Sequence, residues 1–227
     1  SMAIITYENI SIQGVSYQRI LSLEINQNAG EHAKANVQLE VDEAEGITFV
    51  ETAGTDTYIT IQADTDVIFY GVVDKAIQEE LNGYPVLELT LMSTSFLLDL
   101  EPKTATYQKT SMSHEQLMNQ VVGNRATILF EASDKPLGSW NYRNQETDWE
   151  FIQRLASQCG YSLITNVKTQ KPVISIGVSS KKAECQVVDS EHSSNGTNII
   201  YRTYDMVSLG SMYENNEYIN SIKTFID

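Results

Sequence analysis

Hydrophobic and polar residues alternate over much of the first hundred positions. Leu21, Leu23 and Ile25 alternate with polar residues, and the same pattern returns over residues 35–41. A period of two is typical of a strand with one buried face. The Asn-Ala-Gly sequence at 28–30 supplies turn residues between the two runs. The pattern therefore predicts a β-hairpin.

The clearest local signal in this region is the pair Asn82-Gly83. Asn-Gly accepts the positive φ angles that a two-residue type I′ turn requires, so two strands should meet there. Alternation resumes over residues 87–91, and further runs cover 58–63 and 67–73. Six short antiparallel strands in the first hundred residues predict a barrel or a sandwich.

Two helices are predicted in the following region. Ser113 and Gln116 form one capping box, and Thr147 and Glu150 form another, in which side chains satisfy the free amides at a helix start. Gly123 and Gly160 are natural stops. Apolar residues recur at helical spacing behind each box: Leu117, Met118, Val121 and Val122 in the first helix, and Trp149, Ile152, Leu155, Ala156 and Cys159 in the second. With strands over 161–165 and 173–176, this region reads as α+β.

The last fifty residues begin with a weakly patterned polar stretch and become strand-like again over 199–204 and 217–225, around a predicted turn at 214–216. The fold class predicted is α+β and mostly β. An antiparallel barrel-like domain is expected over residues 1–100, an α+β middle domain over 101–190, and the start of a second barrel-like domain over 191–227. The sequence stops at Asp227 without an obvious terminal element, so we expect this second barrel to be incomplete.

The charge balance excludes one large class of function. The formal net charge is −15, with 30 Asp and Glu residues against 15 Lys and Arg residues. Nucleic-acid binders neutralise phosphates with clustered Lys and Arg, so we expect no specific nucleic-acid binding. No apolar run is long enough to cross a bilayer, so no membrane insertion is expected. The two cysteines, Cys159 and Cys185, make no disulfide framework, and Cys159 is expected to be buried.

The sequence contains no recognisable motif for catalysis or cofactor binding. There is no Gly-x-Ser-x-Gly elbow and no phosphate-binding glycine loop, and the histidines His32, His114 and His192 lack metal-ligand spacing. We expect each histidine to lie at the surface or in a capping region. The prediction is therefore a protein that is not an enzyme, without catalytic, cofactor-binding or metal-binding residues.

Three features leave alternatives open. Acidic clusters at 42–45, 79–80 and 99–101 could supply a glycosidase-like acid pair, although acidic residues in turns are usually solvated. The turn at 64–66 lacks the full oxygen-ligand pattern of a calcium loop. Trp149 with Phe151 could form an aromatic ligand platform, but core packing is the favoured interpretation because Trp149 heads the apolar stripe.

Several segments, in order, resemble one family. Residues 144–156, Asn-Gln-Glu-Thr-Asp-Trp-Glu-Phe-Ile-Gln-Arg-Leu-Ala, followed by Cys159-Gly160-Tyr161, resemble the E-S/T-D-x-x-F-I/L-x-R-L-A segment of phage late control D proteins. That family includes the baseplate hubs of myophages and the hub part of VgrG spikes of type VI secretion. Weaker similarities follow in the same order. Phe69–Val73 resembles the family's F-x-G-x-I/V strand, and Leu91–Asp99 resembles the strand leaving its first barrel. Tyr107–Thr110 resembles the stretch before its first helix, and Val207–Gly210 with Tyr218-Ile219 resembles the opening of its second barrel. Ser211 stands where the family often has Asp.

The resemblance implies a structural subunit rather than a catalyst. Three copies would form a homotrimeric ring that joins the tail-tube protein on one side to the central spike protein on the other. The location implied is a virion or tail-like particle, assembled in the bacterial cytoplasm. One alternative is a carbohydrate- or cell-surface-binding β module of a tail particle, which needs exposed aromatic residues gathered in one cleft. Another is an acid-pair hydrolase of the cell wall.

Overall fold

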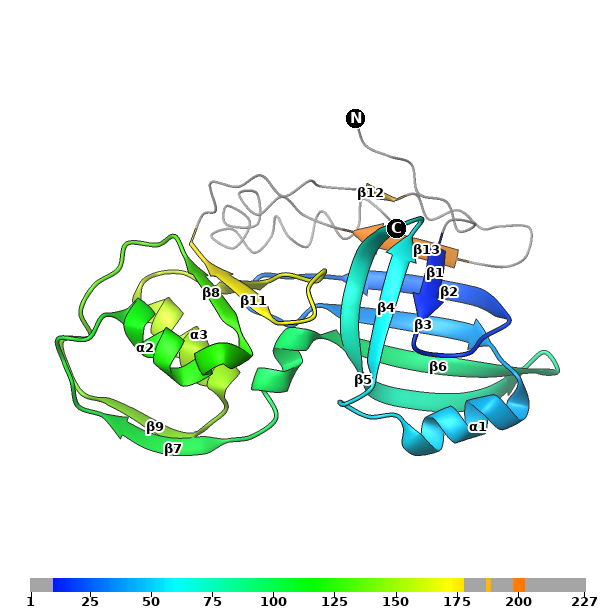
Figure 1. Ribbon diagram of the computed structural model, residues 1–227, viewed down its shortest axis with the longest axis horizontal. Helices are drawn as coiled ribbons and strands as arrows, with labels where there is room; N and C mark the ends of the chain where they lie inside the picture. The colour runs from blue at the N-terminus through cyan, green and yellow to red at the C-terminus, as the bar shows by residue number, and fades with distance from the viewer. Residues whose placement is uncertain (1–9, 178–186, 189–197, 203–227) are drawn as a thin grey trace.

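A computed structural model describes residues 10–177, 187–188 and 198–202 of the chain. Its largest element is an eight-stranded sheet in the order β1-β4-β5-β6-β3-β2-β13-β12. Figure 1 shows this sheet curled around a core, with helices α2 and α3 grouped at the other end of the molecule. Its strands are β1 (Ile10–Gln13), β2 (Arg19–Asn26), β3 (Lys34–Glu40), β4 (Tyr58–Ala63), β5 (Asp66–Leu81), β6 (Tyr84–Ser93), β12 (Val187–Val188) and β13 (Asn198–Arg202).

The predicted hairpins are confirmed, with one change of register. β2 and β3 pair antiparallel, and β5 and β6 meet at Asn82 and Gly83, whose φ angles are 52° and 82°. Leu21, however, does not share the buried face of Leu23 and Ile25. Ile20 pairs with Leu39 and Ser22 with Gln38, so Leu21 lies in a β-bulge and Ile20 takes the buried position.

The predicted number of strands in the first hundred residues was right, but the predicted boundaries between them were wrong. Residues 67–73 and the strand leading into Asn82 are one element, β5, which bends at a bulge between Val73 and Lys75. The sixth strand is β1, which pairs with β4 and was not predicted. A bulge inserts one unpaired residue, so it shifts the alternation by one and a continuous strand looks like two in the sequence.

The sequence also failed to indicate a helix, α1 (Glu43–Thr52), which packs against β5 and β6. Its N-cap is Asp42, whose side chain accepts a hydrogen bond from the Glu45 amide. The acidic cluster at 42–45 is therefore a helix start, where carboxylates interact favourably with the helix dipole. Gly46 faces the sheet so closely that a Cβ there would lie 2.1 Å from Gln78 Oε1.

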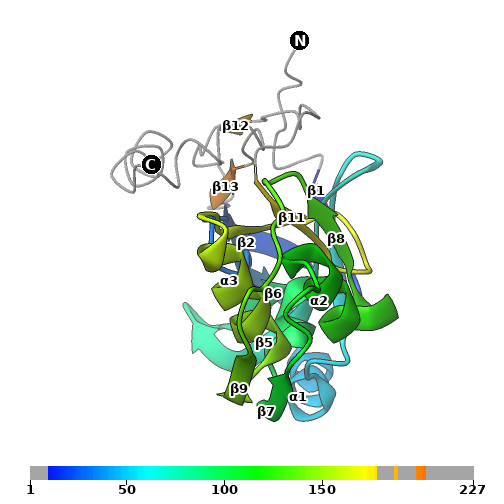
Figure 2. The same cartoon turned by 90° about the vertical axis from the view of Figure 1, so that its left-hand side faces the viewer.

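The middle region is α+β, as predicted. Helices α2 and α3 pack against one another beside a three-stranded sheet and a two-stranded ribbon, and Figure 2 shows the two helices from that end. Both capping boxes are formed, at Ser113 and Thr147. The elements are η2 (Thr94–Leu98), β7 (Lys103–Tyr107), α2 (His114–Val122), η3 (Gly123–Arg125), β8 (Thr127–Phe130), β9 (Asn141–Glu146), α3 (Asp148–Gln158), β10 (Leu163–Thr165) and β11 (Val173–Ile176).

The large sheet and the middle region each have a hydrophobic core of their own. The first is built from β1 to β6, and the second from η2, α2, α3 and the strands around them. Val167 is the exception, because it follows β10 yet is buried in the first core. The predicted class, α+β and mostly β, is confirmed. The parallel pairing of β13 with β2 adds residues 198–202 to the large sheet. The predicted strand over 217–225 and the turn at 214–216 lie outside the described residues.

Candidate functional site: the joint between the two cores

The turn between β2 and β3 is one of the places where the second core attaches to the first. The Gly30 amide donates a 2.7 Å hydrogen bond to the Leu163 carbonyl, and Gln153 Nε2 donates to the Gly30 carbonyl at 2.9 Å. Gly30 has a φ of 79°, and a Cβ there would lie 2.7 Å from Ser162 Oγ. Only glycine meets both demands without strain. The turn predicted from Asn-Ala-Gly is thus also a docking point for α3 and β10.

A chain of polar side chains crosses the same joint. His32 Nδ1 lies 2.8 Å from Ser95 Oγ, and His32 Nε2 lies 2.7 Å from Asp99 Oδ2. The other oxygen of Asp99 accepts a 2.6 Å hydrogen bond from Thr147 Oγ1. Thr147 is the N-cap of α3, so the chain runs from the end of the β2–β3 turn through η2 to the start of α3.

Aromatic rings enclose the imidazole of this chain. The His32 ring is 4.1 Å from the Trp149 ring and 5.6 Å from the Phe96 ring, centroid to centroid. The prediction of a surface or capping-region residue was therefore wrong for His32, whose side chain is only 8% exposed. Asp99 is likewise not a solvated turn residue. Burial acts to raise the pKa of Asp99, but the hydrogen bonds from His32 and Thr147 outweigh it and hold that pKa below its ordinary value.

Ser95, His32 and Asp99 have the hydrogen-bonding order of a catalytic triad, yet the geometry does not allow catalysis. Ser95 is 0% exposed, so no substrate carbonyl can reach its hydroxyl. Its oxygen also lies 2.8 Å from Ser93 Oγ, which accepts a hydrogen bond from the Ala33 amide. These three residues form a structural network whose serine is fully buried and whose aspartate is partly exposed. The three residues lie far apart in the sequence, which explains why no sequence motif indicated the network.

The carboxylate of Asp148 anchors three cations around the start of α3. It pairs with Arg143 at 2.7 Å, with Lys103 at 3.4 Å and with Arg125. Burial acts to raise the pKa of Asp148, and the hydrogen bonds from Arg143 and Arg125 overcome it, so the pKa lies below its ordinary value. Asp148 thereby ties α3 to β7, η3 and β9.

Phe151 is enclosed by rings and guanidinium groups. The guanidinium carbons of Arg143 and Arg154 lie 5.3 Å and 5.0 Å from its ring centroid, and the Tyr107 ring stacks at 5.2 Å. Arg154 also pairs with Glu146 at 2.8 Å, and this hydrogen bond lowers the pKa of Glu146. Trp149 and Phe151 are both buried, so the core interpretation is confirmed and no aromatic platform exists there.

The remaining candidates from the sequence are accounted for as follows. His114 is buried and bonds to Lys135 and Gln158, so the expectation of a capping-region residue holds for it. Cys159 caps α3 and is only partly buried, contrary to prediction, and burial raises its pKa. The Glu79-Glu80 pair is exposed on the β5–β6 hairpin. His192 and Cys185 lie outside the described residues.

Neither a metal site nor a membrane span is found among residues 10–177 and the described parts of 187–202. There, His, Cys, Asp and Glu side chains form no group of three or more that could hold a metal ion. None of the helices in that part of the chain has the length and apolar character needed to cross a bilayer.

This chain is similar to known proteins in its structure but not in its sequence. No protein-family model matches the sequence, and no curated protein sequence does. Solved structures do match. Among them are a tail protein from Neisseria meningitidis MC58 (TM-score 0.54, 12% identity, 78% of this chain and 51% of that one), the E. coli c3393 protein (0.56, 14%, 74% and 49%) and the 43 kDa tail protein of prophage MuSo2 from Shewanella oneidensis (0.57, 16%, 77% and 54%).

The E. coli protein is a component of the type VI secretion system and is structurally similar to the T4 bacteriophage tail proteins gp27 and gp5. The chain therefore has the fold of phage tail proteins and of a type VI secretion component. The structural resemblance expected from the sequence motifs is confirmed. The chain spans about half the length of each of the three structures, at 49% to 54%.

Proposed function

We propose that this chain is a structural subunit of a contractile phage tail or a related injection machine, placed at the baseplate hub. There it adapts the tail tube to the central spike. The observation that carries this proposal is the shared fold with two tail proteins and a secretion component over about three quarters of the chain. In this proposal the chain comprises a barrel-like domain over 1–100, a middle domain over 101–190 and part of a second barrel-like domain over 191–227, whose strand β13 pairs with β2 of the first domain.

The proposed mechanism is geometric. Three copies close a ring, which contacts the tail-tube protein on one face and the central spike protein on the other. The joint around α3 keeps the two cores in one orientation. Hydrogen bonds from the β2–β3 turn, from the N-cap of α3 and within the His32–Asp99 network each connect the first core to the second. The protein acts without cofactor, metal, nucleic-acid specificity or membrane insertion. Its location is the virion or tail-like particle, assembled in the bacterial cytoplasm.

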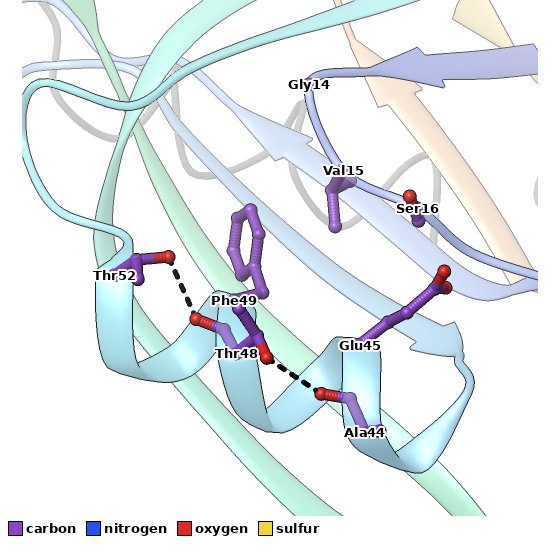
Figure 3. Close-up of a pocket in the computed structure, with 8 residues that line it drawn as sticks. All are labelled: Gly14, Val15, Ser16, Ala44, Glu45, Thr48, Phe49 and Thr52. Carbon is purple, nitrogen blue, oxygen red and sulfur yellow. Dashed lines mark hydrogen bonds between the residues drawn. The ribbon is translucent and has the colours of Figure 1, made fainter.

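Quantitative mass spectrometry of gradient-purified particles from the source strain tests the proposal. A hub subunit is expected at about three copies per particle, as a trimeric ring requires. Absence of the chain from intact particles, or hundreds of copies as in a tube or sheath, would overturn the hub assignment. A carbohydrate-binding module remains the alternative. It would need exposed aromatic residues gathered in one cleft. Trp140 and Tyr142 are exposed, but neither lines the shallow groove that lies between α1 and residues 14–16 (Figure 3).

A further inference from the structure

A cleft of about 510 Å³ lies at the joint between the two cores, and we call it the joint cleft. Strand β4 belongs to the large sheet and β11 to the three-stranded sheet, so both halves of the molecule bound it (Figure 1). Its lining includes Tyr58 of β4, Leu97 of η2, Arg125 of η3, and Lys171 and Pro172 before β11. No carboxylate is among the described residues that line it, although the chain has 30 Asp and Glu residues against 15 Lys and Arg residues. Positive charge is therefore in excess at this one place.

The Arg125 guanidinium is fixed in position and still has hydrogen-bond donors to offer. Its Nη2 group donates to the Val121 carbonyl at 2.9 Å and to Asp148 Oδ2. Its Nε and Nη1 groups have no hydrogen-bond partner among the described residues, and the side chain is 47% exposed. Asp148 does not cancel the charge of Arg125, because it also pairs with Lys103 and Arg143. One carboxylate among three cations leaves this wall of the joint cleft positive.

The second cation, Lys171, stands on a loop whose backbone is held at both ends. The Tyr70 amide of β5 donates a 2.7 Å hydrogen bond to the Val167 carbonyl, and the Thr127 amide donates a 2.9 Å bond to the Pro172 carbonyl. The Lys171 residue itself is exposed, and its side chain has no ion-pair partner among the described residues. Charges on a preorganised support lose little conformational freedom when they bind a ligand.

The lining of the joint cleft selects a carboxylate that has an apolar neighbour. A carboxylate accepts charge-assisted hydrogen bonds from both Arg125 and Lys171. An adjacent apolar side chain removes its surface from water against Tyr58, Leu97 and Pro172. An isolated phosphate ion would use the two cations and leave these apolar groups unused. A nucleic acid would bring many phosphates towards a chain of net charge −15, which repels them.

The groove between α1 and residues 14–16 does not have this chemistry. It is larger, at about 680 Å³, but Glu45 is the one charged residue among those that line it. Figure 3 shows Phe49 of α1 and Val15 of the loop on either side of the space. Apolar surface alone does not identify an occupant, whereas two cations without a counter-charge do.

We propose that the joint cleft binds an acidic peptide segment of another protein, with a carboxylate placed between Arg125 and Lys171 and an apolar side chain beside it. A second copy of this chain offers similar chemistry at Glu79, Glu80 and the exposed Leu81. Two copies of net charge −15 repel one another, however, and a partner with lower net charge does not meet this barrier. The inference goes beyond the proposed hub role and does not depend on it.

Fluorescence anisotropy of labelled synthetic peptides, titrated with the full chain, tests the site. The probe is Gly-Leu-Glu-Glu-Leu-Gly, and the matched peptide has Gln in place of both Glu residues. The Glu peptide is expected to bind about tenfold more tightly or better, and the difference should shrink at raised salt because exposed charges are screened. A third peptide with Ser in place of both Leu residues should also bind more weakly than the probe. Inorganic phosphate that displaces the probe at concentrations equal to the probe's own dissociation constant would overturn the peptide assignment.

Substitutions in the chain locate the binding. Lys171→Gln should weaken binding of the Glu peptide about tenfold and leave binding of the Gln peptide unchanged. Lys168→Gln is the matched control, since Lys168 is exposed on the same loop but does not line the joint cleft, and it should bind like wild type. Arg125→Gln should weaken binding as Lys171→Gln does, with urea unfolding measured beside it because this variant also loses the Asp148 contact.

Three results would overturn the site: no binding of the Glu peptide, equal affinity for the Glu and Gln peptides, or equal losses in Lys171→Gln and Lys168→Gln. Sedimentation velocity of the full chain covers the remaining occupant. Self-association that is lost both in Lys171→Gln and in a chain with Gln at Glu79 and Glu80 would assign the joint cleft to a second copy instead. The copy number per particle is measured independently, so this site can fail while the hub role stands.

Discussion

Thr147 Oγ1 donates a 2.6 Å hydrogen bond to Asp99 Oδ1 and, at 3.1 Å, accepts one from the Glu150 amide. One hydroxyl group therefore caps α3 and attaches it to the segment that leaves the first core. The other oxygen of Asp99 is hydrogen-bonded to His32. His32 follows the turn whose Gly30 carbonyl accepts a hydrogen bond from Gln153. A capping box recognisable in the sequence is in this way also part of the joint between the two cores.

Thr147→Ala should therefore destabilise the protein more than an ordinary cap mutation. Loss of the cap costs about 1 kcal/mol, and loss of a hydrogen bond to a carboxylate adds about 1.5–3 kcal/mol. Urea unfolding measures the total. Ser113→Ala is the matched control, since Ser113 caps α2 in the same way and its side chain has no comparable partner among the hydrogen bonds found. It should cost about 1 kcal/mol, and equal losses in the two variants would contradict the second role of Thr147.

Leu155→Ala should lower the free energy of unfolding by about 2–5 kcal/mol, because it leaves a cavity in the second core. Leu155 is fully buried beneath α3. Leu129→Ala serves as the control, since Leu129 is 37% exposed, and its effect should be within about 1 kcal/mol. An unchanged unfolding midpoint for Leu155→Ala would show that α3 does not pack as described.

Acid should weaken the joint. The pKa values of Asp99 and Asp148 are lower in the folded protein than in the unfolded chain. Their contribution to stability is therefore complete above the ordinary Asp pKa of about 3.9 and is lost as pH falls through the lowered folded values. Unfolding measured from pH 6 to pH 2.5 should show this decline. Asp99→Asn should be less stable at pH 6 and should lose less stability on acidification, and a parallel pH profile would contradict the prediction.

Ser95 should be unreactive despite its histidine and aspartate partners. A fluorophosphonate probe needs access to the serine oxygen, and Ser95 is buried within its network. The folded protein should remain unlabelled while a serine hydrolase in the same tube is labelled. Labelling that Ser95→Ala abolishes would show that the site opens, and would revive an enzymatic function.

The close approach at Gly30 can be isolated by comparing two glycines. Gly30 and Gly83 have nearly equal φ angles, 79° and 82°, but only at Gly30 would a Cβ meet another atom, Ser162 Oγ. Alanine at Gly83 should cost about 1–2 kcal/mol, the strain of a positive φ. Alanine at Gly30 should cost more, because it also pushes the second core away. Equal unfolding free energies for the two variants would mean that the contact is not under constraint.

The sequence by itself determined the elements whose signals are local. The Asn82-Gly83 turn, the two capping boxes and the stripe from Trp149 to Leu155 appear where they were predicted, because each depends on residues within a few positions of one another. The resemblance carried by residues 144–156 rests on the same local signals. It indicated the correct class of fold, although no family model matches the chain.

Only the tertiary structure decided what these local elements contact. The bulge that removes Leu21 from the core depends on pairing with β3, and α1 depends on the sheet beneath it, where Gly46 meets Gln78. His32 was expected at the surface or in a capping region, because nothing near it in sequence shows that Ser95, Asp99 and Trp149 will surround it. These partners are separated from His32 by 63 residues or more. Burial of a polar side chain is decided by such distant partners, since only the folded chain brings together the groups that replace its water.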